Sequence, residues 1–230
     1  MFRIKVCGVT TAEDARAAGE AGADAVGLNF YPRSKRHISV EQAAEISAAL
    51  PKEVMRVGVF VDADLGAIEA AHAAVRFDAL QLHGHESPEF LRDVRKSALA
   101  DVPVLRALAC GDSLTHVAEY LDRCRQLDCL PRWVMLDAAA AGHPGGTGMT
   151  CDWTTAAAYH RLNAAPPLVL AGGLSADNVA EAIAAVRPAA VDVATGVESA
   201  PGRKDLAKLR RFIAAARKAF DESMPLSPQP

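Results

Sequence analysis

Two reactive side chains, Cys7 and Asp137, stand at the ends of short and mostly apolar runs. Cys7 follows the run 4–6 and precedes Gly8, and Asp137 closes the run 133–136. A thiol and a carboxyl that face one small substrate suit paired base and acid roles. A lone cysteine is, however, more often a small core residue, and a carboxylate here can equally serve the fold. The residues alone leave both interpretations open.

The elements that would position these groups are eight apolar runs that alternate with eight helix-like segments. The runs are nearly continuous, which is typical of a parallel sheet covered by helices. Helix starts are marked by Ser39 with Gln42 and by Ser87 with Pro88. Eight such units in about 220 residues predict an α/β fold, the (β/α)8 TIM barrel, rather than a doubly wound sheet, which usually has fewer units and a G-x-G-x-x-G after its first strand. The expected strands are 4–9, 25–30, 56–61, 79–83, 102–108, 133–137, 168–171 and 190–194.

The composition narrows the class of protein. The net charge is −3 with both signs interspersed and no basic stripe, which argues against nucleic acid as a partner. Five cysteines without a C-x-x-C pair predict reduced thiols, with no disulfide framework and no metal site. Met1 leads directly into a strand and no run is long enough to cross a bilayer, so we expect no signal peptide, no membrane partner and a cytoplasmic protein. The barrel domain is predicted over residues 1–220, and residues 221–230 as a disordered tail.

In a barrel of this kind, functional groups lie at the carboxyl ends of the strands, so residues distant in sequence would meet at one mouth. Gly172 and Gly173 follow the seventh run, and Thr195 and Gly196 follow the eighth. Glycine lets the backbone approach an anion closely, and the loops after these two strands commonly bind phosphate. We therefore predict a phosphate site here, with tight turns alone as the alternative.

Three further polar residues would lie at the same mouth. Arg36 belongs to a loop with Arg33 and Lys35, and its guanidinium suits a carboxylate clamp, although a solvated basic loop is the more ordinary interpretation. His83 ends the fourth run without a carboxylate near it in sequence, which favours a structural role. Asp192 lies within the eighth run, where it either accepts hydrogen bonds from a ligand or anchors the loops.

Short motifs in a fixed order, spread over residues 1 to about 220, carry a family resemblance. They are Lys5–Thr10, Gly22–Gly27, Tyr31–Arg36, Val57–Val61, Gln81–Gly84, Leu136–Asp137, Gly145–Gly148, Ala171–Leu174 and Val191–Glu198. Each motif is short, but together they are specific. The set resembles the phosphoribosylanthranilate isomerases of tryptophan biosynthesis.

The resemblance implies an Amadori rearrangement of N-(5′-phosphoribosyl)anthranilate to 1-(2-carboxyphenylamino)-1-deoxyribulose 5′-phosphate, with no cofactor and no metal. It implies that Cys7 is the general base and Asp137 the general acid. Arg36 would hold the anthranilate carboxylate, and Asp192 would bond the substrate near its amine. The expected partner is thus a small phosphorylated aminosugar, and the expected assembly is a monomer or a weak homodimer. The residues implied in phosphate binding are Gly146, Gly172, Gly173, Thr195 and Gly196.

This chemistry sets expectations for the two central groups. Asp137 must be protonated when the sugar ring opens, and the end of an apolar strand can raise the pKa of a carboxyl. Cys7 must act as a thiolate, so we expect its surroundings to stabilise the anion. Lys5, two residues away, is a candidate for that role, because side chains two residues apart lie on one face of a strand.

Some residues depart from the family pattern, and two other functions compete. Asn29 stands where the family often has an apolar residue, Ala194–Thr195 replaces the more usual Ser-Ser, and the loop Ala138–Pro144 is rich in Ala.

A histidine-pathway aminoaldose isomerase would usually place an Asp where Cys7 stands. A non-catalytic phosphometabolite-binding protein would have no need of both Cys7 and Asp137.

Overall fold

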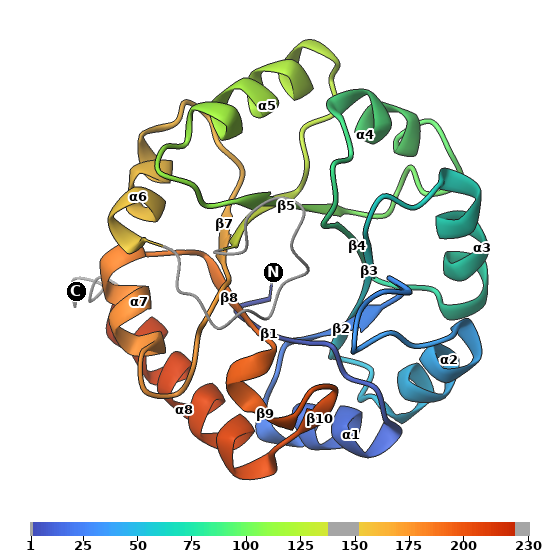
Figure 1. Ribbon diagram of the computed structural model, residues 1–230, viewed down its shortest axis with the longest axis vertical. Coiled ribbons are helices and arrows are strands. Elements are labelled where there is room, and N and C mark those ends of the chain that lie inside the picture. Colours follow the sequence, from blue (N-terminus) through green and yellow to red (C-terminus); the bar gives the residue numbers. More distant parts are fainter. Residues whose placement is uncertain (1, 138–151, 224–230) are drawn as a thin grey trace, which may run out of the picture.

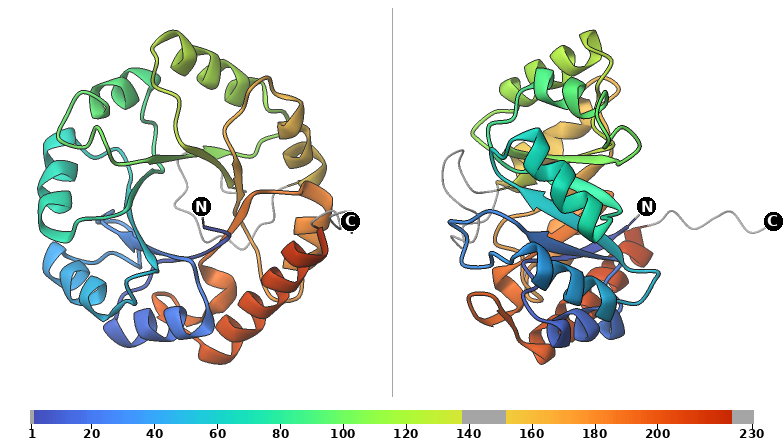
Figure 2. Two further views of the ribbon diagram at one scale, coloured as in Figure 1. Left: turned by 180° about the vertical axis from the view of Figure 1, so that it is seen from behind. Right: turned by 90° about the vertical axis from the view of Figure 1, so that its right-hand side faces the viewer.

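Eight parallel strands close into a barrel, and helices surround it on all sides (Figure 1 and Figure 2). The computed structural model describes residues 2–137 and 152–223. The prediction of a (β/α)8 barrel is confirmed. The barrel strands are β1 (Ile4–Cys7), β2 (Ala25–Asn29), β3 (Met55–Phe60), β4 (Ala79–Leu82), β5 (Val104–Ala109), β6 (Trp133–Asp137), β7 (Leu168–Leu170) and β8 (Ala190–Val193). The α-helices of the described residues are α1 (Ala12–Ala21), α2 (Val40–Ala49), α3 (Leu65–Val75), α4 (Pro88–Val94), α5 (Thr115–Gln126), α6 (Trp153–Ala157), α7 (Val179–Val186) and α8 (Leu206–Ser223).

The strands pair in chain order, and the ring closes where β1 pairs with β8. Two predicted helix starts are confirmed. The Ser39 side chain accepts a hydrogen bond from the backbone N–H of Gln42, whose own side chain bonds back to Ser39, which makes a capping box. Ser87 caps α4, and Pro88 occupies its first turn. These caps set where the chain leaves each loop at the mouth of the barrel.

The amino-terminal end of the barrel is closed by packing. The Phe2 and Trp133 rings lie with centroids 5.4 Å apart, and small or branched side chains of the other strands fill the space around them. A second and larger core lies between the strands and the helices. Because one end is plugged in this way, polar side chains inside the barrel open toward the carboxyl ends of the strands.

Two features of the carboxyl-terminal part differ from the sequence-based expectation. After β8 the chain forms a short 3-10 helix, η2 (Thr195–Val197), and a two-stranded hairpin of β9 (Glu198–Ala200) and β10 (Arg203–Lys204). A strand of two residues carries too little periodicity to be found in a sequence. The last helix continues to Ser223, past the predicted domain boundary at residue 220, although its buried face ends at Phe220. Residues 224–230 of the predicted tail lie outside the described residues.

The cysteines are not all free thiols. Cys7, Cys124 and Cys129 are free, whereas Cys110 is disulfide-bonded. The prediction of reduced thiols throughout is therefore wrong at Cys110, because spacing in sequence does not reveal which thiols the fold brings together. None of the helices within 2–137 and 152–223 has the length and apolarity needed to span a bilayer.

Candidate active site

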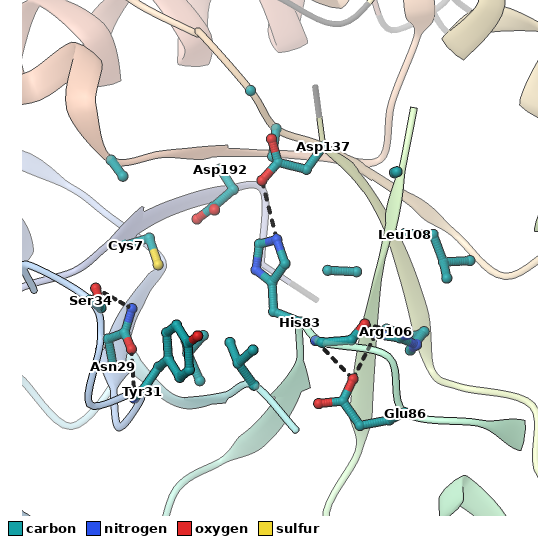
Figure 3. A pocket seen from close by; sticks show the side chains of 18 of the residues that line it. Cys7, Asn29, Tyr31, Ser34, His83, Glu86, Arg106, Leu108, Asp137 and Asp192 are labelled. Atoms are coloured by element: carbon teal, nitrogen blue, oxygen red, sulfur yellow. Dashed lines mark hydrogen bonds and ion pairs between the residues drawn. The ribbon is translucent and has the colours of Figure 1, made fainter. Parts of the chain in front are cut away.

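A cavity of about 620 Å³ opens at the carboxyl ends of the barrel strands (Figure 3). Among the described residues, no three His, Cys, Asp or Glu side chains gather as a metal site would require. The predicted Gly146 and the loop Ala138–Pro144 lie outside the described residues. The cavity is lined by every other predicted site residue, namely Cys7, Arg36, Asp137, Gly172, Gly173, Asp192, Thr195 and Gly196.

Cys7 ends β1 and is half-buried in the cavity wall. The strand register explains its neighbours: Cys7 lies opposite Gly27 of β2, and Lys5 lies opposite Asp192 of β8. The Lys5 ammonium donates a hydrogen bond of 2.8 Å to Oδ1 of Asp192, and the Lys5 side chain is fully buried. Cys7 and Lys5 share the inner face of one strand, so a buried ion pair lies directly below the thiol.

The expected stabilisation of the Cys7 thiolate is only partial. Burial raises the pKa of the Cys7 thiol above its ordinary value, while the nearby ammonium groups of Lys5 and Lys204 oppose that rise. The direction of this pKa contradicts the expectation that the site favours the anion. The sequence shows which charged residue lies two positions away, but it does not show how far the strand is desolvated.

Asp137 ends β6 and is largely buried. Its Oδ2 lies 3.2 Å from Nε2 of His83, whose imidazole points across the cavity toward it (Figure 3). The Nδ1 atom of His83 lies 2.9 Å from Nε2 of the buried Gln81. His83, for which the sequence favoured a structural role, thus contacts the predicted acid. The expected rise in the pKa of Asp137 stays a prediction.

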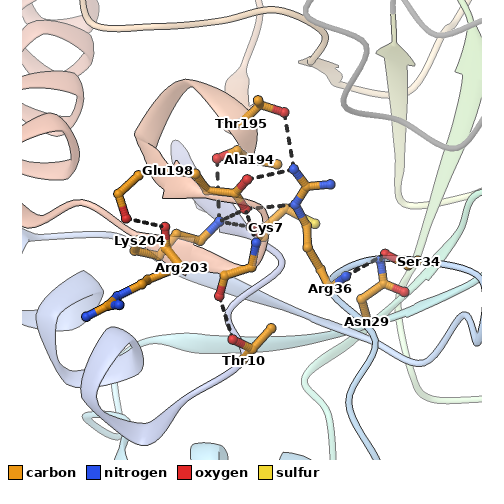
Figure 4. Close-up of polar contacts among 12 residues, drawn as sticks. Cys7, Thr10, Asn29, Ser34, Arg36, Ala194, Thr195, Glu198, Arg203 and Lys204 are labelled. Carbon is orange, nitrogen blue, oxygen red and sulfur yellow. Dashed lines mark hydrogen bonds and ion pairs between the residues drawn. The ribbon is translucent and has the colours of Figure 1, made fainter.

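Arg36 is fixed by a carboxylate that the sequence analysis did not pair with it. Its Nε and Nη2 donate hydrogen bonds of 2.7 and 2.6 Å to the two oxygens of Glu198, and Nη2 also reaches the Thr195 hydroxyl at 3.4 Å (Figure 4). The guanidinium is therefore no solvated surface cation. With one edge held by Glu198, its Nη1 side is the edge available for a ligand.

Lys204 of β10 completes this charged cluster (Figure 4). Its buried ammonium donates to Oε1 of Glu198 at 3.0 Å and to the carbonyl oxygens of Cys7 at 2.7 Å and Ala194 at 3.4 Å. Burial alone would raise the pKa of Glu198, but the hydrogen bonds and charges of Arg36 and Lys204 outweigh it and hold that pKa below its usual range. Lys204 therefore ties the end of β1 to the loop after β8.

Gly8 lets Arg36 reach this position. Its φ of +70° is a conformation that side chains disfavour, and a Cβ placed on it would overlap the aliphatic part of Arg36. Asn29 supports the same loop from β2. Its side chain accepts a hydrogen bond from the backbone N–H of Tyr31 at 2.9 Å and donates one to the Ser34 hydroxyl at 3.2 Å. The departure from the family pattern at Asn29 thus has a local role in holding the loop that carries Arg36.

The two predicted phosphate loops lie against each other at the cavity wall. Gly172 and Gly173 have φ of +88° and +62°, and the Gly173 carbonyl accepts a hydrogen bond of 3.0 Å from the Asn178 side chain. A Cβ on Gly196 would overlap the carbonyl oxygen of Leu174, so only glycine permits this approach of η2 to the loop after β7. The pair of loops can present backbone groups to an anion from two sides.

Known proteins are similar to this chain in sequence and fold. Residues 4–215 match the family described as N-(5'phosphoribosyl)anthranilate (PRA) isomerase. A relative from Acidithiobacillus ferrooxidans, named N-(5'-phosphoribosyl)anthranilate isomerase, is 46% identical over 217 residues, which are 94% of this chain and 98% of the relative. The crystal structure of phosphoribosyl anthranilate isomerase from Thermotoga maritima matches with a TM-score of 0.80 and 38% identity, over 95% of this chain and 100% of that chain.

A further crystal structure is similar to the same degree and carries a ligand. It is a phosphoribosyl anthranilate isomerase in complex with reduced 1-(o-carboxyphenylamino)-1-deoxyribulose 5-phosphate, with a TM-score of 0.79 and 38% identity over 95% of this chain and 100% of that one. The family match spans far more than half of the chain, and the relatives are matched over nearly their whole length. This chain belongs to the N-(5'-phosphoribosyl)anthranilate isomerase family.

Proposed function

We propose that this protein catalyses the Amadori rearrangement of N-(5′-phosphoribosyl)anthranilate, with Cys7 as general base and Asp137 as general acid. The observation that carries the residue assignment is that β1 and β6 bring the thiol and the carboxyl to one cavity, between which Asp192 and His83 also project (Figure 3). The names of the relatives and the reduced product analogue in one of the similar structures support the substrate.

In the proposed reaction, Asp137 donates its proton to the ring oxygen of the ribose, the bond from C1′ to that oxygen breaks, and a protonated Schiff base forms at C1′. The Cys7 thiolate then takes the C2′ proton. The electron pair of that C–H bond forms the C1′–C2′ double bond of the enolamine, and the nitrogen becomes neutral. Tautomerisation of the enolamine yields the ketose. The positive charge of the Schiff base favours the thiolate at the step that needs it.

The substrate is proposed to lie with its phosphate against the loops after β7 and β8. Gly172, Gly173, Thr195 and Gly196 supply that end of the cavity, to which Gly146 is predicted to contribute. Glu198 already occupies one edge of Arg36, so the anthranilate carboxylate would meet the Nη1 edge.

Asp192 is proposed to accept a hydrogen bond from the amine of the substrate. Its Oδ1 is engaged by Lys5, so Oδ2 is the oxygen proposed for this contact. In this arrangement the substrate nitrogen lies between Cys7 and Asp137, next to the carbon that loses its proton. The cytoplasmic location and the monomeric or weakly dimeric state also remain predictions.

The test follows the loss of anthranilate-type fluorescence after the purified protein is added to the substrate, with EDTA present to remove free metal ions. We expect turnover that is proportional to protein concentration and unaffected by the chelator. The double variant C7A/D137N, prepared in the same way, is the control for contaminating host enzyme. Turnover equal to this control would overturn the proposed function, and turnover that disappears with EDTA would overturn its metal-free form.

A further inference from the structure

The proposed reaction assigns no step to Lys5, the buried lysine below Cys7. Lys5 lies in the barrel interior with no exposed surface, on the same strand as Cys7. An ammonium in such a place is costly unless it is paired and has a purpose there. Its carboxylate partner Asp192 is 2.8 Å away and comes from the strand that closes the ring.

Gly27 shows how close the thiol and the ammonium are. A Cβ placed on this glycine would lie 2.7 Å from Sγ of Cys7 and 3.1 Å from Nζ of Lys5. Sγ of Cys7 and Nζ of Lys5 both border the space that a side chain at this position would fill. The distance between these two atoms therefore cannot exceed the sum of the two distances. Two charges at such a separation in a desolvated site interact strongly.

We propose that Lys5 is a positioning residue that acts through Cys7: its ammonium is the counter-charge of the thiolate, and Asp192 tethers that ammonium beneath the sulfur. The inference rests on the proposed function, in which Cys7 is the base. Lys5 keeps all three of its protons throughout, because the C2′ proton passes to sulfur and not to nitrogen. The role is electrostatic, and it requires no contact between Lys5 and the substrate.

The protonation state of Lys5 agrees with this role. Burial alone would lower the pKa of Lys5, but the charges of Asp192 and of a Cys7 thiolate outweigh it and hold that pKa above its ordinary value, so Lys5 remains an ammonium. The charged groups that face Cys7 from the surrounding elements are Lys5 on β1, Asp192 on β8, Lys204 on β10 and Arg36 in the loop after β2. Lys204 and Arg36 are both bound to Glu198, whereas Lys5 is buried beneath the thiol itself.

The test titrates Cys7 without any substrate. The rate of alkylation by iodoacetamide is measured against pH, and the modified Cys7 peptide is identified by mass so that Cys124 and Cys129 do not contribute. For K5M we expect the midpoint of the Cys7 titration to rise by at least about one unit, since a positive neighbour of the thiolate is lost. The control K218M removes an exposed lysine of α8 and should leave the midpoint unchanged.

If K5M does not fold by circular dichroism, K5Q replaces it, because Gln can still bond to Asp192. An unchanged Cys7 midpoint in K5M, or in K5Q where it replaces K5M, would overturn the inference.

Kinetics connect the titration to the reaction. Near neutral pH, a one-unit rise in the thiol pKa lowers the thiolate fraction about tenfold, so kcat of K5M should fall about tenfold and recover as the pH is raised. A loss of kcat that does not recover at higher pH, with no shift in the thiol titration, would overturn the role of Lys5 and leave the proposed function standing. Absence of isomerase activity in the unaltered protein would instead overturn the proposed function, whatever the titration shows.

Discussion

The two oxygens of Glu198 hold Nε and Nη2 of Arg36 at 2.7 and 2.6 Å, although 162 positions separate these residues in the chain. Both side chains are largely buried, and the Lys204 ammonium lies on the same carboxylate. The direction of the guanidinium is therefore set before any ligand arrives. A binding group that is already oriented loses less entropy when it binds, which favours substrate affinity.

Removing the charge of Glu198 should weaken substrate binding. In E198Q the amide has only one oxygen that can accept from the Arg36 guanidinium, so Arg36 is held less firmly at the cavity wall. We expect KM for the phosphoribosylated substrate to rise about tenfold with a smaller change in kcat, because the contact is made in both the ground state and the transition state. E222Q, at an exposed site near the end of α8, is the control. An unchanged KM in E198Q would mean that Glu198 does not orient Arg36.

Glu198 should also make the fold sensitive to acid. Its pKa is held below the ordinary value of 4.5, so its contribution to the free energy of unfolding is fully present above pH 4.5 and is lost as the pH falls through the lower value of the folded state. Urea unfolding from about pH 7 down to about pH 3.5 checks this by comparing the unaltered protein with E198Q. The stability difference between them should shrink at low pH. A difference that is constant across this range would contradict the prediction.

Loss of the thiol at Cys7 should remove the base and leave the fold intact. C7A deletes a small, half-buried group beside a cavity, so we expect little change in the thermal midpoint. Its kcat should fall by about 10²-fold to 10⁴-fold. C124A in α5 is the matched control, since Cys124 is buried away from the cavity and should affect stability alone. Near-normal turnover in C7A would refute the role of Cys7.

Loss of the acid at Asp137 should have an effect of similar size by a different route. The amide of D137N retains the shape of the carboxyl group and can still bond to His83, but it has no proton to give to the ring oxygen. Steady-state kinetics should show a fall in kcat of about 10²-fold or more. D221N changes an exposed carboxylate of α8 and serves as the control. Folded D137N protein with unaltered kcat would exclude Asp137 as the acid.

A methyl group on Gly8 should disturb the fold and the site together. G8A forces a φ of +70° on a side-chain-bearing residue and places its Cβ within the volume of Arg36. We expect the free energy of unfolding to fall by about 1 kcal/mol or more, and KM to rise as Arg36 is displaced. G111A is the control, because a Cβ there would meet only the Ser113 carbonyl oxygen, at 3.9 Å. Denaturation by urea and steady-state kinetics check both effects.

The sequence was sufficient to predict which strand ends meet. A parallel barrel brings the carboxyl ends of all its strands to one side, so placing Cys7 and Asp137 at strand ends was enough to bring them to one cavity. The positions of Gly172, Gly173 and Gly196 at the cavity wall, after β7 and β8, followed from the same rule. The helix starts at Ser39 and Ser87 were found because a cap depends on residues only three positions apart.

Side-chain pairs between distant segments of the chain could not be predicted from the sequence. His83 meets Asp137 from two strands away, and Arg36 meets Glu198 from the opposite part of the chain. Neither pair has a spacing that a pattern can reveal, since both depend on strand register and loop shape. The pKa of Cys7 was misjudged for a related reason, because its direction depends on how completely the barrel excludes water.

Closure of the ring between β1 and β8 has a consequence for biosynthesis of the protein. Cys7 belongs to the first barrel strand to be made, yet Asp192 and Lys204 are made some 190 residues later. A nascent chain that has not yet released its final strands lacks those charged neighbours, and its first strand has an unpaired edge. The thiol thus acquires its reactive surroundings in the same late event that seals the barrel, and a chain truncated before that event would be inert.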